Sequence, residues 1–310
     1  MAAGTTGDVR YAHNADVRIA YEDLGGTGGD PLLLIMGMAL SRFWWPPALA
    51  GELVRRGFHV AAYDQRDAGQ STHFQSAAGR GPVPAVLRRG APAYTAEDMT
   101  DDAVAVLDAL GWESAHVFGH SMGGQLAQRT ALRHPGRVRT MTSSAALPSD
   151  VSGLRAARYV NARTVARLAR MKFPGGRDGD LDLAVACVRA LAARGQAIDE
   201  ELIRQMAGRD QVSGIRDLAA QGRQAGATWH GGRLSQLRVP ALILHGAGDP
   251  LLRPAAARRT AAAISGARLV IMPGTGHFLP ADVYPRVAGE VRALAERAAQ
   301  PPWTSAMADS

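Results

Sequence analysis

Short apolar runs alternate with helical periods along most of this 310-residue chain. Runs of this length without polar alternation are typical of strands that are buried on both faces of a parallel sheet. They lie at residues 32–35, 60–63, 115–118, 241–244 and 267–272, and residues 138–142 are predicted to form another strand. Helical periods separate them, and an amphipathic period over 284–299 closes the chain. The pattern predicts an α/β fold with a mostly parallel, doubly wound sheet.

Local signals predict several further elements. Residues 9–11 and 17–21 alternate apolar and polar positions around a turn, which predicts an antiparallel hairpin at one edge of the sheet. Thr95 and Asp98 form a capping-box pattern, which predicts the start of a helix. The stretch 74–93 is rich in Pro and Gly and has no clear period, so we expect a long irregular loop near the site.

A long gap interrupts the strand pattern between residues 147 and 237. Only helical periods occur there, with a Pro- and Gly-rich break at 174–180. An all-helical segment between two sheet strands is typical of a lid. We therefore expect a helical lid over 147–237 and a core formed by 1–146 and 238–299. The remaining residues, 300–310, are expected to be a disordered tail.

One strand ends in a Gly-x-Ser-x-Gly pattern, and a helical period follows it. The pattern reads Gly119-His120-Ser121-Met122-Gly123. A serine at such a junction has a strained backbone that exposes its hydroxyl above the sheet, and the flanking glycines let strand and helix cross closely. Glycine is common in this chain, so the pattern alone also arises by coincidence. Ser121 is a candidate nucleophile if a base reaches it.

Two later strands end in glycine-bearing turns that each present one polar side chain. Asp249 follows the run 241–244 in Gly-Ala-Gly-Asp, and His277 follows 267–272 in Gly-Thr-Gly-His. Ser, then Asp, then His is a chain order known for the nucleophile, acid and base of acyl transfer. We therefore expect these residues to form a catalytic triad. The nine histidines are dispersed without metal-ligand spacing, so we expect no metal and no cofactor.

The loop after the first buried strand is the candidate for half of an oxyanion hole. It reads Met36-Gly37-Met38-Ala39, and an ordinary strand-to-helix turn would have the same pattern. Its position favours the functional interpretation, because the backbone N–H of Met38, or of a neighbour, can lie opposite that of Met122. Two such donors stabilise a developing oxyanion by roughly 3–4 kcal/mol each.

Further residues near these loops are candidates for binding substrate or supporting the site. We expect Gly37, Trp44, Trp45 and His120 to line the substrate site, although core packing also explains the tandem tryptophans. The polar turn at 64–71 follows another buried strand, and we expect it to brace the nucleophile loop by hydrogen bonds.

Composition narrows the class of protein. With 310 residues and a hydrophobic content of 46%, the chain is long enough for one large α/β core with an inserted subdomain, or for two small domains. The formal net charge is +7, but the basic residues, all Arg except Lys172, are dispersed, so we expect a solvated surface and no nucleic-acid partner. Cys187 is the only cysteine, and we find no pattern of a signal peptide or membrane span. We expect a cytoplasmic protein that acts on a small molecule; its oligomeric state stays open.

The motifs of this chain resemble those of the α/β-hydrolase superfamily over about residues 8–298. They are GHSMGG, HGAGDPL and GTGH, each after a strand. Two loops resemble a narrower group, the aclacinomycin methylesterases of aromatic-polyketide tailoring. LLLIMGMALSRFWWP has Met-Gly where many relatives have His-Gly, and YDQRDAGQS has Asp67 where the commoner pattern has glycine. The resemblance implies a serine hydrolase that cleaves a methyl ester of an anthracycline-like compound.

Three other functions stay open at this point. A cofactor-free decarboxylase, lyase or oxygenase would use His277 as base and Ser121 only as a hydrogen-bond donor, so its activity would survive loss of the serine. A peptidase resembling proline iminopeptidases would need acidic lid residues, for which Glu200 and Glu201 are candidates, although a helix N-terminus explains them more simply. A non-catalytic binding protein is disfavoured by the intact Ser-Asp-His set.

Overall fold

The computed structural model describes residues 9–75, 93–210 and 214–300. Most of the predicted loop 74–93 and the predicted tail residues 301–310 lie outside this range. Within it, eight strands form one sheet in the order β1-β2-β4-β3-β5-β6-β7-β8. The strands are β1 (Arg10–Asn14), β2 (Val17–Gly25), β3 (Asp30–Ile35), β4 (Phe58–Tyr63), β5 (Ala115–His120), β6 (Val138–Ser144), β7 (Ala241–Gly246) and β8 (Arg268–Met272).

The sheet is parallel except at one edge. β1 and β2 form the predicted antiparallel hairpin, and β2 pairs antiparallel with β4. The pairs from β4 and β3 through to β7 and β8 are parallel. The mostly parallel α/β sheet that the apolar runs predict is therefore confirmed.

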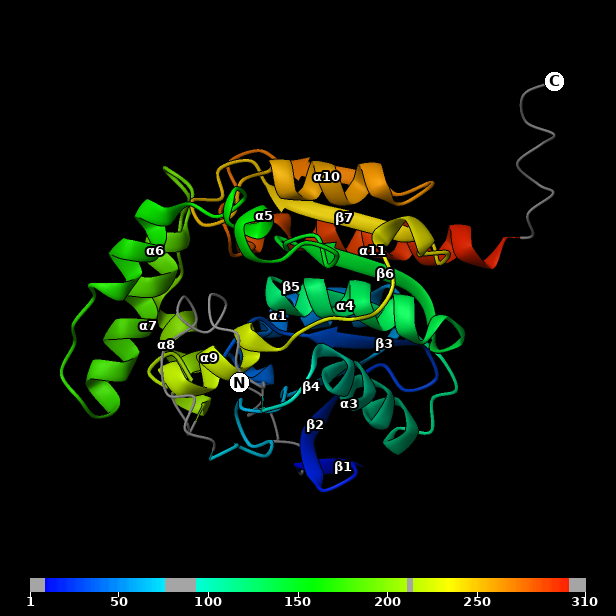
Figure 1. Cartoon of the computed structure of the whole chain (residues 1–310), viewed down its shortest axis with the longest axis horizontal. Coiled ribbons are helices and arrows are strands. Elements are labelled where there is room, and N and C mark those ends of the chain that lie inside the picture. Colours follow the sequence, from blue (N-terminus) through cyan, green and yellow to red (C-terminus); the bar gives the residue numbers. More distant parts are fainter. Residues whose placement is uncertain (1–8, 76–92, 211–213, 301–310) are drawn as a thin grey trace.

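Helices cover both faces of this sheet (Figure 1). They are α1 (Pro47–Arg55), α3 (Ala96–Ala109), α4 (Met122–Arg133), α10 (Ala255–Ala263) and α11 (Tyr284–Ala299). Alternate residues of β3 explain the two layers, because successive strand side chains point to opposite faces. Leu32 and Leu34 belong to the apolar cluster that includes α1 and α11, whereas Leu33 and Ile35 belong to the cluster that includes α3, α4 and α10. A continuous apolar run is thus buried on both sides.

Local sequence signals set several helix ends. The predicted capping box starts α3, since Asp98 N donates to Thr95 Oγ1 at 3.2 Å and Thr95 N donates to Asp98 Oδ2 at 2.7 Å. The predicted closing helix is α11, with the expected bounds. The sequence does not predict α10, because its residues AAARRTAAA include no large apolar side chain that would mark a period.

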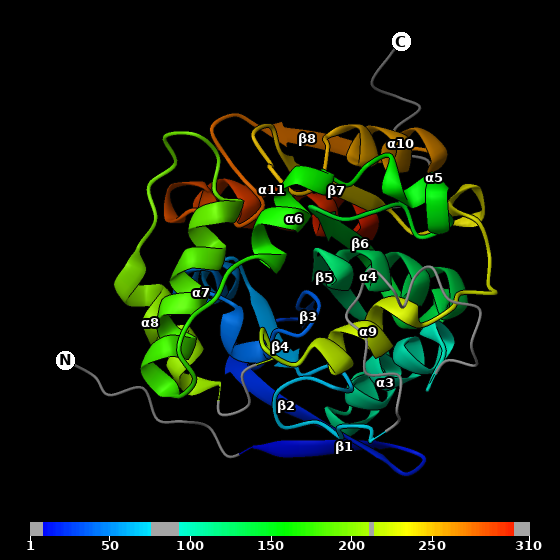
Figure 2. The same cartoon turned by 60° about the vertical axis from the view of Figure 1, so that its left-hand side comes forward.

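Residues 147–237, here called the insertion, contribute no strand to the sheet within the described range; one short 3-10 helix (Leu234–Gln236) and five α-helices lie between β6 and β7. The α-helices are α5 (Gly153–Ala157), α6 (Ala162–Ala169), α7 (Arg177–Leu191), α8 (Glu200–Arg209) and α9 (Leu218–Gly226). The predicted break at 174–180 is shorter in the structure, because α7 begins at Arg177. Figure 1 places α6, α7 and α8 beyond one end of the sheet, and Figure 2 brings this side forward. None of the described helices is both long and apolar enough to cross a bilayer.

Candidate active site

Ser121 lies on a sharp turn between β5 and α4, as its motif predicts. Its φ of 56° and ψ of −122° are unusual for a residue with a side chain. The flanking glycines are required by close packing: a methyl group on Gly119 would overlap the carbonyl of Gly123, and one on Gly123 would overlap the carbonyl of Ile35. The turn therefore holds the hydroxyl of Ser121 at the end of the central strand, where it is partly exposed.

The structure brings Asp249 and His277 to this serine. Asp249 follows β7 and His277 follows β8, and the parallel strands end at the same edge of the sheet. His277 Nε2 lies 3.0 Å from Ser121 Oγ, and His277 Nδ1 lies 2.8 Å from Asp249 Oδ2. The other carboxylate oxygen of Asp249 accepts bonds from the N–H groups of Leu251 and Leu252 at 2.8 and 2.9 Å. The three side chains thus form one continuous chain of hydrogen bonds.

The surroundings keep Asp249 ionised. Burial alone would raise the pKa of its carboxyl, but the adjacent His277 and the Leu252 amide outweigh that effect and lower the pKa below its ordinary value. A carboxylate at Oδ2 accepts the Nδ1 proton of His277, which leaves Nε2 as the acceptor for the hydroxyl of Ser121. The arrangement can therefore remove a proton from the serine.

His120 and His245 lie around this chain of bonds but are buried and neutral. Burial lowers the pKa of His120 to about 3, and it lowers the pKa of His245 as well. The ring of His120 lies 5.3 Å from that of His277 and 5.6 Å from that of Phe278, measured between centroids. His120 therefore packs beside the base, and only 4% of its surface is exposed. Its predicted contact with substrate stays a prediction.

The loop predicted to supply oxyanion donors lies directly beside the serine. A methyl group on Gly37 would come within 3.2 Å of Ser121 Cβ and 3.7 Å of its Oγ. The loop turns back on itself, since Leu40 N donates to Gly37 O at 3.4 Å and Ala39 has a left-handed φ of 62°. Met38 follows Gly37 in this turn, and Met122 begins α4 on the other side of Ser121. The two chain segments that are expected to supply the donors therefore meet at Ser121.

The polar turn at 64–71 braces this loop rather than the nucleophile turn. Gln65 Nε2 donates to Met36 O at 2.5 Å, and Asp64 Oδ1 accepts from Arg42 N at 2.6 Å. The hydrogen bonds that we expected to support the loop at Ser121 are thus made instead to the neighbouring loop after β3. Strand order explains the difference, because β4 pairs with β3 and not with β5. The loop that follows β4 consequently reaches the loop that follows β3.

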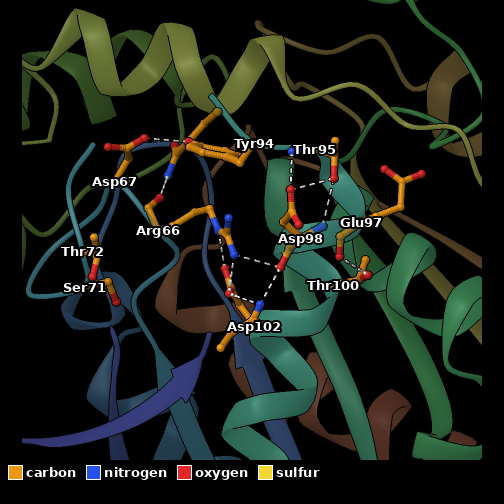
Figure 3. Close-up of polar contacts among 12 residues, drawn as sticks. Arg66, Asp67, Ser71, Thr72, Tyr94, Thr95, Glu97, Asp98, Thr100 and Asp102 are labelled. Carbon is orange, nitrogen blue, oxygen red and sulfur yellow. Dashed lines mark hydrogen bonds and ion pairs between the residues drawn. The ribbon is translucent and has the colours of Figure 1, made fainter. Parts of the chain in front are cut away.

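Asp67, also in this turn, forms a buried ion pair that the sequence does not reveal. Its two carboxylate oxygens accept bonds from Nε and Nη2 of Arg223 on α9, both at 2.8 Å. Tyr94 Oη donates to the same carboxylate at 2.7 Å, as Figure 3 shows. Burial and the charge of Asp67 raise the pKa of Tyr94, so its hydroxyl remains a donor. Asp67 is thus fully engaged away from His277.

The tandem tryptophans occupy two different environments, and both are buried. Trp45 packs edge-on against Phe118 of β5, with centroids 5.1 Å apart, so it belongs to the core. Trp44 lies 6.3 Å from the ring of Phe278 and lines a cavity of about 220 Å³ between α7 and α8. This cavity also contacts Leu181 and Asp210 but not Ser121. Trp44 is therefore the tryptophan that borders open space.

Comparison with known proteins defines the class to which this chain belongs. It matches the family model of the alpha/beta hydrolase fold over residues 30–282, so the chain is a member of that family. It is 30% identical to a rhodomycin D methylesterase of Streptomyces peucetius, across 91% of this chain and 96% of the relative. It is 29% identical to a rhodomycin D methylesterase of Streptomyces sp. strain C5, across 89% and 94%. The protein is an α/β-hydrolase with methylesterases among its relatives, as the two loops led us to expect.

Solved structures show the same fold at lower identity. A meta-cleavage product hydrolase from Pseudomonas fluorescens aligns with a TM-score of 0.71 at 21% identity, covering 93% of this chain and 98% of the other. An esterase from Rhodococcus sp. aligns with the same score, identity and coverage. At this identity the likeness concerns the fold alone.

Proposed function

We propose that this protein hydrolyses a methyl ester of an aromatic polyketide through an acyl-enzyme on Ser121. The observation that carries the proposal is the continuous hydrogen-bond chain from Ser121 through His277 to Asp249, with distances of 3.0 and 2.8 Å. A base within reach of the serine, oriented by a buried carboxylate, is what acyl transfer requires.

The first half of the reaction forms the acyl-enzyme. Ser121 Oγ attacks the ester carbonyl carbon while His277 Nε2 takes the hydroxyl proton. The N–H groups of Met38 and Met122 bind the oxyanion, and the closeness of Gly37 to Ser121 supports this assignment because it brings the loop that carries Met38 next to the attacking hydroxyl. His277 then donates its proton to the leaving methoxide, and methanol departs.

The second half repeats these steps with water. His277 takes a proton from a water molecule, whose oxygen attacks the acyl carbon and forms a second oxyanion in the same hole. When this intermediate collapses, the proton on His277 returns to Ser121 Oγ, and the carboxylic acid is released. Asp249 stays ionised throughout and stabilises the imidazolium, in agreement with its lowered pKa.

The substrate class rests on the full-length relatives, which are rhodomycin D methylesterases. We infer that the core, 1–146 and 238–299, carries the triad and that the insertion acts as a lid over the substrate. Phe278 packs edge-on against His277, with centroids 5.8 Å apart, and is a candidate aromatic contact for a flat ring system. Within the insertion, Leu168 is half-buried and could line the substrate site, whereas Leu154 is 85% exposed and is unsuited to this role.

The proposal is tested by an active-site phosphonate and by Ser121→Ala. Intact-protein mass spectrometry should show one adduct on the wild type and none on Ser121→Ala. The variant should keep its fold and lose several orders of magnitude in ester turnover, because the triad acts as one unit. Turnover within tenfold of the wild type would refute the acyl-enzyme and favour a lyase or oxygenase that uses His277 alone.

Substrate choice needs a separate comparison. We expect kcat/KM for a carbomethoxy anthracycline to exceed that for p-nitrophenyl acetate, because binding of the rings positions the ester over Ser121. Product masses distinguish loss of the methyl group from loss of the whole carboxyl group. If only small esters are cleaved, the polyketide assignment is wrong and a general esterase remains.

A further inference from the structure

The insertion holds the backbone on both sides of the base. Gly276 N donates to Gln196 Oε1 at 2.6 Å, His277 N donates to Leu191 O at 2.8 Å, and Gln196 Nε2 donates to Phe278 O at 3.2 Å. Leu191 is the last residue of α7, and Gln196 lies between α7 and α8. Three consecutive residues centred on the base are therefore each bonded to the insertion.

The loop that carries His277 packs so closely against the turn after α7 that neither can shift alone. A methyl group on Gly276 would overlap Ala193 N and Leu191 O. Gln196 Oε1 also accepts from Ala193 N at 3.0 Å, so one side-chain amide joins the turn after α7 to the loop that carries His277. The distance between His277 Nε2 and Ser121 Oγ thus depends on where the insertion places this amide.

A second glutamine of the insertion holds the oxyanion loop. Gln224 on α9 is 3% exposed, and its Oε1 accepts from Ala39 N at 2.8 Å. Its Nε2 donates to Arg66 O, also at 2.8 Å, so the amide bridges the loops after β3 and β4. Ala39 has a left-handed φ of 62°, a conformation that costs an L-residue energy and needs support from its surroundings.

The neighbouring ion pair fixes α9 in this place. Arg223, which precedes Gln224, binds Asp67 through two bonds of 2.8 Å, and the two side chains are 4% and 0% exposed. A bidentate pair of this kind defines orientation as well as distance. Gln224 therefore reaches Ala39 from a helix that cannot rotate without breaking the ion pair between Arg223 and Asp67.

We propose that Gln196 and Gln224 are positioning residues for the ester hydrolysis proposed above, on which this inference rests. Gln196 sets the base loop, and Gln224 sets the loop that presents Met38 N–H to the oxyanion. The insertion is then part of the catalytic framework as well as a cover for substrate. Misplacement of reacting groups by about 1 Å costs on the order of 100-fold in rate, and loss of an oxyanion donor costs about 100- to 1000-fold.

The test compares Gln196→Met and Gln224→Met with Gln205→Met. Gln205 is the control, because it also belongs to the insertion, is exposed, and its Nε2 donates to Glu201 Oε1 of the same helix, α8, at 3.0 Å. The substrate is p-nitrophenyl acetate, which is too small to depend on a lid pocket. For each of the two test variants we expect kcat to fall about 10- to 100-fold with KM within about twofold of the wild type. The control should keep its kcat.

A transition-state analogue separates positioning from general weakening of the fold. A trifluoromethyl ketone adds to Ser121 and places an oxyanion in the hole, so its inhibition constant should rise in parallel with the loss of kcat/KM. Thermal midpoints report stability independently. If the test variants lose thermal stability but keep kcat and the inhibition constant, the glutamines are structural only and the inference is wrong.

Two further controls make each outcome decisive. Should a methionine variant fail to fold, Gln196→Asn and Gln224→Asn keep the amide but shorten its reach, and the same criteria apply to them. Phosphonate labelling of Ser121 in the wild type distinguishes a failure of the proposed function from a failure of the positioning role. Without labelling, the proposed function fails; with labelling and test variants that behave like Gln205→Met, only the positioning role fails.

Discussion

Replacing Asp67 by glycine should destabilise the protein, even though glycine suits the backbone there. Asp67 has a left-handed φ of 63°, and relief of that strain would stabilise the folded state by about 1 kcal/mol. The same change leaves the guanidinium of Arg223 without its bidentate partner in a site that is 4% exposed. Breaking a buried ion pair from one side costs about 3–5 kcal/mol. The net loss should therefore be about 2–4 kcal/mol.

A double-mutant cycle measures the interaction energy between Asp67 and Arg223. Arg223→Met alone should cost a similar amount, because it buries an unpaired carboxylate that retains only Tyr94 Oη and Phe74 N as donors. The double variant Asp67→Gly with Arg223→Met removes both charges, and it should lie closer to the wild type than either single variant. The coupling energy should thus be about 2 kcal/mol or more.

Urea unfolding at neutral pH, followed by circular dichroism, measures these differences. Asp180→Asn is the control, because the ion pair of Asp180 with Arg216 also belongs to the insertion but is about a third exposed on each side. It should cost less than about 1 kcal/mol. Additive losses in the cycle, or an Asp67→Gly variant as stable as the wild type, would refute the reasoning.

Three further predictions concern the site itself. Asp249→Asn should lower kcat by about four orders of magnitude, because it permits the wrong tautomer of His277; full activity would mean that another group orients the base. Gly37→Ala should keep the fold but lower kcat/KM by about tenfold or more, since its methyl group would lie 3.2 Å from Ser121 Cβ. Acid should destabilise the protein through His120, whose pKa falls from 6.5 to about 3 on burial. Between those values the unfolded chain binds the extra proton, so His120 should contribute a loss of about 1.4 kcal/mol in the free energy of unfolding for each unit that pH decreases. Burial lowers the pKa of His116 and His245 as well, so urea unfolding of His120→Asn should show a smaller slope but keep part of it.

The sheet and the three strand-end residues could be predicted because their signals are local. An apolar run marks a buried strand wherever it stands, and the glycines around Ser121 are demanded by contacts within a few residues of it. The order of the parallel strands then brings Asp249 and His277 to the serine. The order of the three motifs in the chain and their positions at strand ends were therefore sufficient to predict that Ser121, Asp249 and His277 lie together.

The supporting residues could not be predicted because their partners are distant in the chain. Gln196 lies 80 residues from Gly276, and Gln224 lies 185 residues from Ala39. A single glutamine does not belong to a hydrophobic pattern that would mark it as buried. A helical period identifies the apolar face of a helix but does not identify what that face contacts.

The unusual residue at position 67 nevertheless carries information about the insertion. Where the commoner pattern has glycine, this chain places an aspartate in a left-handed conformation, at a cost of about 1 kcal/mol. Hydrogen bonds to charged groups contribute about 1.5–3 kcal/mol each, so the two bonds from Arg223 offset that cost. A buried aspartate with a strained backbone in a core loop thus implies a basic side chain that reaches it from another part of the fold. Here that cation comes from α9, and the same helix brings Gln224 to Ala39 in the loop after β3. The unusual residue at position 67 and the placement of the insertion are therefore parts of one arrangement.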